Sequence, residues 1–132
     1  RIQLYYHADS IFIGKTDMMF SYNNMDQNYD PSPILSHGIG FWAYYYDSAR
    51  IRIYGPRTNS QTVTVNRTGW ILIGSKVAPV PLSELQLSDH AEIYGPAFRY
   101  EPRELKYYPV EVLEPGRSYW IYVSNPCTII IP

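Results

Sequence analysis

The sequence predicts an all-β protein in which two homologous units of short antiparallel strands form a sandwich or a small barrel with pseudo-twofold symmetry. Three observations lead to this fold. Aromatic residues make up 16% of the 132 residues, and fourteen residues are tyrosines, which favour a pleated, half-buried surface. Eleven prolines and eight glycines interrupt the chain too often for long helices. No segment places its apolar residues at a sustained period of about 3.6, the period of an α-helix.

Short apolar and aromatic runs between turn residues predict the strands of the first unit. In order, these strands cover residues 2–6, 10–13, 19–22, 41–46 and 50–54. In the last of them Ile51 and Ile53 alternate with Arg50 and Arg52, the pattern of an amphipathic strand with one wet face. Residues 23–33 are polar and contain two prolines, and they predict a loop.

The second unit is predicted in the same way. Its strands cover residues 62–65, 70–73, 92–94, 98–100, 119–123 and 128–131, with a loop at 101–106. Residues 77–87 carry Pro79 and Pro81 and predict an irregular crossing with at most one helical turn, at 82–85. Residues 55–61 hold glycine, proline and polar residues, so they predict a linker. The predicted organisation is a first β repeat over 1–54, a linker over 55–61 and a second β repeat over 62–132.

An internal repeat supports this division. Trp42 and Trp120 are 78 residues apart, and identical residues recur at the same offset over strands and turns without a gap. The other matching pairs are Phe20 and Phe98, Tyr22 and Tyr100, Tyr29 and Tyr107, Pro31 and Pro109, Leu35 and Leu113, Gly38 and Gly116, Tyr44 and Tyr122, Ile51 and Ile129, and Ile53 and Ile131. A match of this length predicts a duplicated β unit.

The first unit lacks one strand of the second. At the repeat offset, residues 69–74 would align before Arg1, where the chain begins without an initiator methionine, as a processed or trimmed product does. Residues 62–65 could supply the missing strand in cis, or a neighbouring molecule could supply it in trans. An unfilled position leaves backbone N–H and C=O groups along a sheet edge, which favours pairing with another chain.

Three segments carry a family resemblance. Residues 69–74 are G-W-I-L-I-G, residues 113–123 are L-E-P-G-R-S-Y-W-I-Y-V, and residues 127–131 are C-T-I-I-I. They resemble a β module repeated in secreted and cell-surface proteins of prokaryotes, often archaea, with the pattern GWNLIG, LxPGxGYWVYV and CTL. The chain departs from this pattern at Ile71, where asparagine is usual, and at Ser118, where glycine is usual. The resemblance covers residues 69–131 well and 4–54 in part, and it implies an extracellular or cell-surface location without a particular activity.

Charge and composition argue against several kinds of partner. Eleven Lys and Arg against twelve Asp and Glu give a net charge of −1, and no basic run could neutralise phosphates, so no nucleic-acid partner is expected. No apolar run approaches the roughly 20 residues that span a bilayer, so no membrane insertion is expected. The single cysteine, Cys127, has no partner for an internal disulfide.

Tyrosines are the candidate interface or ligand-binding residues. Successive side chains of a strand point to opposite faces, so at least one residue of the Tyr44–Tyr45–Tyr46 run is expected at the surface. The full set of candidates is Tyr5, Tyr6, Tyr44, Tyr45, Tyr46, Tyr107 and Tyr108. Trp42 and Trp120 are expected to form a core aromatic pair. The alternative for these two tryptophans is a pair of platforms that stack sugar rings.

Two further motifs suggest a cation site and a glycan site. Asp26, Asn28 and Asp30 have the D-x-N-x-D spacing of a calcium loop, but Pro31 stands where such loops turn at glycine and no bidentate glutamate follows at the required distance. A solvated turn is therefore expected, with calcium as the alternative and no other cofactor. Asn66-Arg67-Thr68 is an N-glycosylation sequon in a predicted turn, so Asn66 is a candidate glycan acceptor in a secreted protein.

Catalytic motifs are missing from the sequence. His7, His37 and His90 have no metal-ligand spacing, and the chain contains no G-x-S-x-G, H-E-x-x-H or phosphate-cradling glycine loop. The sequence therefore predicts a non-enzymatic extracellular building block, the subunit of a surface layer, appendage or filament. Its expected partners are copies of itself, which associate through strand edges and tyrosine-rich faces. The alternative is a carbohydrate-binding module that uses exposed Tyr and Trp side chains on a polysaccharide.

Overall fold

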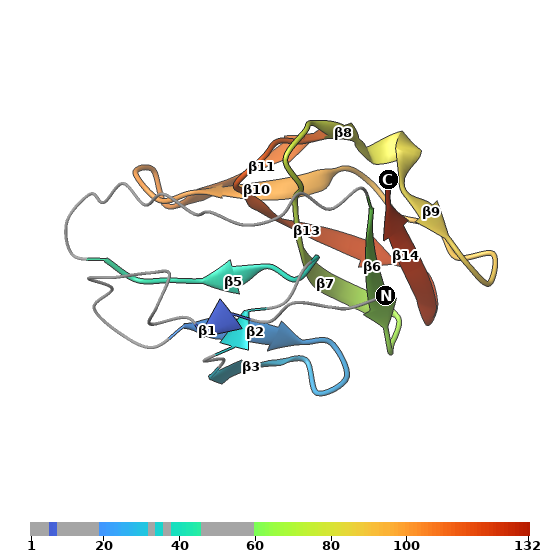
Figure 1. The fold of residues 1–132 in the computed structure, drawn as a ribbon, viewed down its shortest axis with the longest axis horizontal. Helices are drawn as coiled ribbons and strands as arrows, with labels where there is room; N and C mark the ends of the chain where they lie inside the picture. Colours follow the sequence, from blue (N-terminus) through green and yellow to red (C-terminus); the bar gives the residue numbers. More distant parts are fainter. Residues whose placement is uncertain (1–5, 8–18, 32–33, 36–37, 46–59) are drawn as a thin grey trace.

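The computed structural model describes residues 6–7, 19–31, 34–35, 38–45 and 60–132. The predicted strands at 10–13 and 50–54, most of 2–6 and residues 55–59 of the linker lie outside this part. Within it the protein is all-β, as predicted, because all paired strands are antiparallel and no sheet closes into a barrel (Figure 1). The helical element of the described residues is a 3-10 turn, η1 (Leu82–Glu84), and it falls within the single turn predicted at 82–85.

The second unit contains two sheets that share a core. One has the strand order β11 (Lys106–Val110), β10 (Ala97–Glu101), β13 (Ser118–Val123) and β7 (Gly69–Gly74). The other has the order β6 (Gln61–Val65), β14 (Cys127–Ile131) and β9 (Gln86–Leu87). A short pair, β8 (Val80–Pro81) with β12 (Val112–Leu113), forms a separate two-stranded sheet.

Alternation along the strands builds this core. In β6 the valines Val63 and Val65 are buried while Thr62 and Thr64 are exposed. The residues of β13 alternate in the same sense, and the buried set joins both sheets. Its largest fully buried side chains are Tyr119, Ile73, Leu113, Ile121, Ile129, Ile131, Val63, Val65 and Val123. Each contributes about 1.5–3 kcal/mol to folding by burial of apolar area, so the second unit has a core of its own.

The first unit contributes a smaller sheet on one side of the four-stranded sheet (Figure 1). Its order is β3 (Asn28–Pro31), β2 (Phe20–Asn23) and β5 (Phe41–Trp42), and a separate pair joins β1 (Tyr6–His7) to β4 (Ile34–Leu35). The strand register of this sheet recurs in the second unit at the offset of 78. Phe20 pairs with Pro31 and Trp42, as Phe98 pairs with Pro109 and Trp120.

The two hairpin turns also match. Gln27 in the β2–β3 turn and Leu105 in the β10–β11 turn both have positive φ, of 53° and 54°, a conformation that non-glycine residues seldom adopt. The sequence repeat thus corresponds to a repeated hairpin with the same register and the same turn.

Several predicted boundaries were wrong. The predicted loop 23–33 contains β3, and β11 follows the predicted loop 101–106 without having been predicted. The reason is that both strands contain a proline, which is tolerated at a sheet edge, where one side of the strand needs no ladder hydrogen bonds. The strand predicted at 41–46 ends at Trp42 in the described residues, and the one predicted at 92–94 is reduced to an isolated bridge between Ile93 and Val123.

Candidate functional site

Five aromatic rings, which we call the aromatic seam, join the two units: Tyr22, Tyr29, Trp42, Tyr100 and Trp120. Trp120 of β13 meets Tyr22 of β2 with 4.8 Å between ring centroids and Tyr29 of β3 with 6.4 Å, both edge-on. Trp42 of β5 meets Tyr100 of β10 with 5.2 Å. Tyr100 and Trp120 are the repeat counterparts of Tyr22 and Trp42. The contacts are therefore reciprocal, with a tryptophan of each unit packed on a tyrosine of the other.

The backbones of the two units approach closely beside the seam. The Gly40 N–H donates to the Leu72 carbonyl at 3.2 Å, and the Gly74 N–H donates to the Gly38 carbonyl at 2.9 Å. A Cβ atom at Gly40 would lie 2.6 Å from Leu72 Cγ and 2.9 Å from Ser118 Cβ. The approach therefore requires glycine, and it gives β7 backbone contacts on both of its edges, with β13 on one and with residues 38–40 on the other.

The predicted tryptophan pair lies in this seam. Both Trp42 and Trp120 are half-buried, and neither belongs to the cluster of buried residues in the second unit. Burial, and next the neighbouring phenol of Tyr107, raise the pKa of the Tyr29 hydroxyl. Tyr29 and Tyr107 are themselves repeat counterparts, so the two hairpins come near each other at equivalent positions.

The predicted tyrosines are dispersed over the described surface. Tyr44 and Tyr107 are about half exposed, at 57% and 50%, whereas Tyr45 and Tyr108 are half-buried. Tyr6 lies in β1, and Tyr5 and Tyr46 lie outside the described residues. The structure brings Tyr107 onto Tyr100 at 5.1 Å between ring centroids, so this tyrosine continues the seam toward solvent.

A second group of rings, the aromatic strip, was not predicted as a site: Trp70, Tyr94 and Tyr122. Trp70 is 41% exposed and Tyr94 is 55% exposed. Tyr122 lies between them, 5.4 Å from Trp70 and stacked on Tyr94 at 6.1 Å. Trp70 and Tyr122 are paired neighbours on one face of β7 and β13. Sequence alone did not give that pairing.

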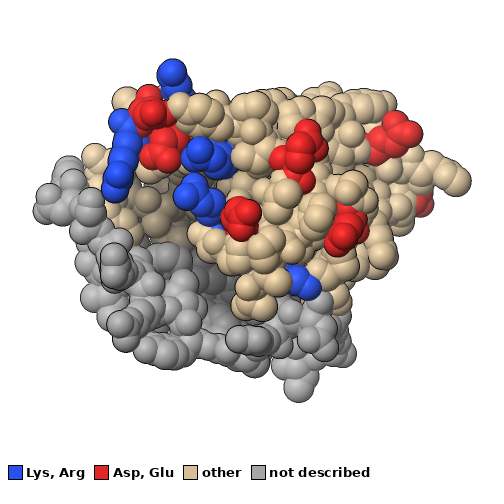
Figure 2. Space-filling view, turned by 90° about the horizontal axis from the view of Figure 1, so that it is seen from above, with Lys and Arg blue, Asp and Glu red and all other residues tan. Residues whose placement is uncertain are grey.

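A polar hollow of about 800 Å³ opens beside the β10–β11 hairpin, and we call it the arginine hollow. Basic and acidic side chains gather around it on the face shown in Figure 2. Its lining is Arg99, Glu101, Pro102, Arg103, Glu104, Tyr108 and Arg117. Three arginines against two glutamates give this lining a formal excess of one positive charge.

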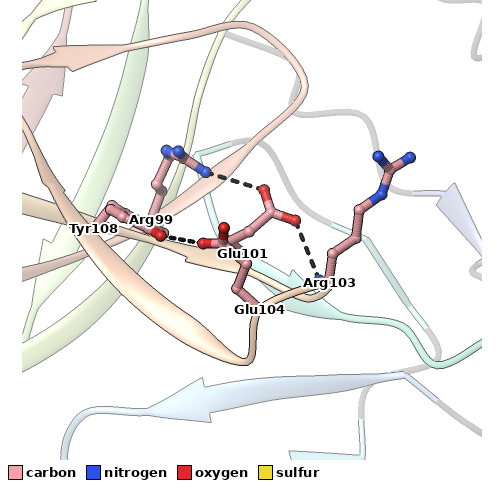
Figure 3. A network of polar contacts seen from close by, with 5 residues as sticks. All are labelled: Arg99, Glu101, Arg103, Glu104 and Tyr108. Carbon is pink, nitrogen blue, oxygen red and sulfur yellow. Dashed lines mark hydrogen bonds and ion pairs between the residues drawn. The ribbon is translucent and has the colours of Figure 1, made fainter.

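A network of polar contacts organises one wall of the hollow (Figure 3). Arg99 Nη1 lies 3.3 Å from Glu101 Oε2, and its guanidinium sits 4.9 Å above the centre of the Tyr108 ring. The Arg103 backbone N–H, and to a lesser extent the Arg99 guanidinium, hold the pKa of Glu101 below its usual value. The Tyr108 hydroxyl donates to Glu104, and this bond raises the pKa of Tyr108.

The predicted calcium motif forms a hydrogen-bonded turn. The Asn23 side-chain amide donates to Asp26 Oδ2 at 3.1 Å and to Asp30 Oδ2 at 3.0 Å. Asn28 Oδ1 accepts from the Tyr29 N–H at 2.9 Å. Among the described residues no group of three or more His, Cys, Asp or Glu side chains is placed to hold a metal ion.

The remaining predicted positions are simple to place. Asn66 is exposed just after β6, so the sequon is accessible to solvent. Cys127 is buried at the start of β14, and burial, then the charge of Asp89, raise the pKa of its thiol. His90 is exposed at positive φ, His7 lies in β1, and His37 lies outside the described residues.

The sheet edges differ in how they are protected. Pro31 and Pro109 stand in the edge strands β3 and β11. The edge strand β6 has five residues, Q-T-V-T-V, without proline or charge. In the described residues β5 pairs with β2 alone, whereas its counterpart β13 is paired on both sides. The suggestion that residues 62–65 fill that position in cis is wrong, because β6 pairs with β14 and buries its valines in the second unit's core.

No helix in the described ranges is long and apolar enough to cross a membrane. Comparison with protein-family models, with curated protein sequences and with solved structures finds no match for the chain.

Proposed function

We propose that the protein is a non-enzymatic building block of an extracellular assembly, such as a surface layer, appendage or filament, and that it associates with copies of itself through strand edges. The edge of β6 that faces away from β14 carries this proposal. The residues of β6 alternate between buried valine and exposed threonine, and no described strand covers its second edge. Edges of this kind accept a strand from another chain through backbone hydrogen bonds.

The contrast between edges supports the same function. A strand edge that must stay unpaired is usually protected by proline, charge or shortness. Here β3 and β11 carry prolines, and β11 also begins with Lys106. β6 has none of these devices. β5 is the counterpart of β13, and the edge of β5 that does not pair with β2 corresponds to the edge of β13 that pairs with β7. This edge of β5 is the second place where a strand of another molecule could add.

Two homologous units related by a pseudo-twofold axis fit this role. Trp120 of the second unit contacts Tyr22 of the first, and the equivalent residues, Trp42 and Tyr100, make the same contact in the opposite direction. A twofold axis between the units would produce such reciprocal contacts. The resemblance to the repeated cell-surface module favours an extracellular location. In a secreted protein the exposed Asn66 would be the glycan acceptor.

The test is the assembly state of the intact chain and of edge variants. Light scattering and negative-stain electron microscopy of the unaltered chain are expected to show filaments or sheets. Thr64→Lys puts a charge on the β6 edge strand and is expected to abolish them, whereas Ser83→Lys adds the same charge in η1 and leaves them intact. Circular dichroism checks that both variants fold. An unaltered chain that stays monomeric up to high concentration contradicts the proposal.

A second candidate function, carbohydrate binding, rests on the aromatic strip. Exposed rings offer apolar faces to sugar rings, and Trp70 and Tyr94 are among the most exposed aromatic side chains described. Retention on polysaccharide columns measures this function. Trp70→Ala and Tyr94→Ala are expected to abolish retention, while Val77→Ala, which truncates an exposed apolar side chain that is not part of the strip, leaves it unchanged. Retention that survives both strip variants argues against this candidate.

A further inference from the structure

The turn of the β2–β3 hairpin presents two carboxylates in a fixed arrangement. Asp26 and Asp30 are exposed, and one amide group, that of Asn23, donates to both. Neither carboxylate pairs with a Lys or Arg of the described residues. A charge that is held in place loses little side-chain entropy when it meets a partner. We call this segment, residues 23–30, the acidic turn.

The arginine hollow presents the opposite charge. The guanidinium group of Arg99 already contacts the Glu101 carboxylate and the Tyr108 ring. Arg99 therefore forms part of the fixed wall. The guanidinium groups of Arg103 and Arg117 contact no acceptor in the described residues, and Figure 3 shows the Arg103 side chain extending away from the network. Two guanidinium groups without partners therefore border one open hollow, and each can bind a carboxylate in a bidentate manner.

The acidic turn and the hollow belong to hairpins whose turns lie on different sides of the molecule (Figure 1). The β2–β3 turn and the β10–β11 turn point in opposite directions along the longest axis (Figure 1). One molecule therefore cannot bring its own turn into its own hollow, but the turn of one copy can enter the hollow of the next. A contact between two different surfaces of identical molecules repeats without closing unless its rotation happens to form a ring.

We propose that the arginine hollow binds the acidic turn of a second copy, with Arg103 and Arg117 pairing with Asp26 and Asp30, so that copies join head to tail. This inference rests on the proposed self-association and adds the contact that gives it direction. An acidic polysaccharide is the competing occupant. The observations favour the turn, because Glu101 and Glu104 line the same hollow and would repel a chain of many carboxylates more than a local pair.

Two charge-reversed variants test the contact. Arg103→Glu with Arg117→Glu makes the hollow acidic, and Asp26→Lys with Asp30→Lys makes the turn basic. For each variant alone, the association constant measured by light scattering is expected to fall at least about tenfold, because like charges then face each other. An equimolar mixture is expected to assemble again into an alternating polymer, because every turn then meets a hollow of opposite charge. Glu84→Lys, on η1, is the control for a change of net charge.

The outcomes separate this inference from the proposed function. If both variants assemble alone as well as the unaltered chain does, the head-to-tail contact is overturned while the proposed function stands. Failure of the mixture to assemble also overturns the contact. An unaltered chain that never assembles overturns both. Retention on a polygalacturonate column that the arginine variant abolishes, without any change in assembly, assigns the hollow to an acidic polysaccharide instead.

Discussion

The indole of Trp120 meets the phenol ring of Tyr22 edge-on, with 4.8 Å between the ring centroids. The two residues belong to different units, and the corresponding contact between Trp42 and Tyr100 has 5.2 Å. Edge-to-face contacts of this kind bring the positive edge of one ring to the negative face of the other. The seam is thus a stabilising contact that holds the smaller first sheet on the larger second one.

The energy of this contact is measurable by a double-mutant cycle. Trp120→Leu and Tyr22→Leu, alone and combined, are expected to show a coupling of about 1 kcal/mol in the free energy of unfolding, beyond the loss of buried area. Urea denaturation followed by tryptophan fluorescence and circular dichroism gives the four values. The cycle for Trp42 and Tyr100 is the matched control and should give a similar coupling. Additive effects in both cycles would show that the rings do not interact.

Gly40 is a position of the first unit where a side chain does not fit. Gly40→Ala is expected to lower the free energy of unfolding by about 1–3 kcal/mol, because the added Cβ overlaps Leu72 and Ser118. Gly116→Asn is the control, since no atom lies within 4 Å of a Cβ there and asparagine tolerates positive φ. Thermal denaturation compares the two. If the alanine at position 40 costs less than the asparagine at 116, the close approach to β7 is contradicted.

The repeat made the hairpin positions predictable, yet two of its strands were missed. Tyr29 and Pro31 were aligned with Tyr107 and Pro109, but residues 23–33, with two prolines, were predicted as a loop and residues 107–110 were assigned to no strand. In the structure these residues form the edge strands β3 and β11, where proline is compatible with one-sided pairing. The sequence contains the alternation that builds the core around Val63 and Val65. It does not contain the order of strands in a sheet, which depends on contacts between distant segments.

For the same reason the arginine hollow was not predicted. Arg99 and Glu101 lie on β10, Tyr108 lies on β11, and Arg117 follows β12. Only the pairing of β10 with β11, in the register Arg99 opposite Tyr108, places the guanidinium over the ring. Over the whole sequence, the positive and negative charges nearly cancel. Their local excess depends on the fold.

Tyr108 provides a test of the polar network by titration. The neutral hydroxyl donates to Glu104, so ionisation of the phenol would set two negative charges against each other, and the pKa of Tyr108 is raised. The contact is therefore present below the usual phenol pKa of about 10 and is lost as the pH rises through the raised value. Carbon-13 NMR of labelled tyrosines is expected to follow this titration, with Tyr108→Phe assigning the signal. Glu104→Gln should shift the pKa back toward the usual value, and an unchanged titration would contradict the hydrogen bond.

Cys127 is expected to behave as a buried, unreactive thiol. It is 6% exposed, and both burial and Asp89 raise its pKa, so little thiolate is present at neutral pH. Reaction with a coloured thiol reagent at pH 8 should then proceed mainly through the unfolded fraction, about 10⁻³ or less of the molecules. The same reagent in denaturing urea gives the reference rate. Comparable rates with and without urea would contradict the buried position.

Tyr119 is the most informative single side chain of the core, because it is 1% exposed and still bears a hydroxyl group. The oxygen of that hydroxyl accepts from the Glu114 backbone N–H at 2.7 Å, and the bond ties the turn before β13 to the strand. Tyr119→Phe keeps the ring and leaves this N–H without its partner. The free energy of unfolding is expected to fall by about 1–2 kcal/mol, the usual cost of a lost hydrogen bond at a partly buried group.

The control for this change is Tyr94→Phe, which removes a hydroxyl from an exposed ring that has no hydrogen bond in the described structure. It is expected to change stability by less than about 0.5 kcal/mol. Urea denaturation measures both variants, and amide exchange at Glu114 should accelerate only in Tyr119→Phe, since that N–H becomes available to water. Equal stability of the two variants, with slow exchange at Glu114 in both, would mean that β13 is positioned by its apolar side chains alone.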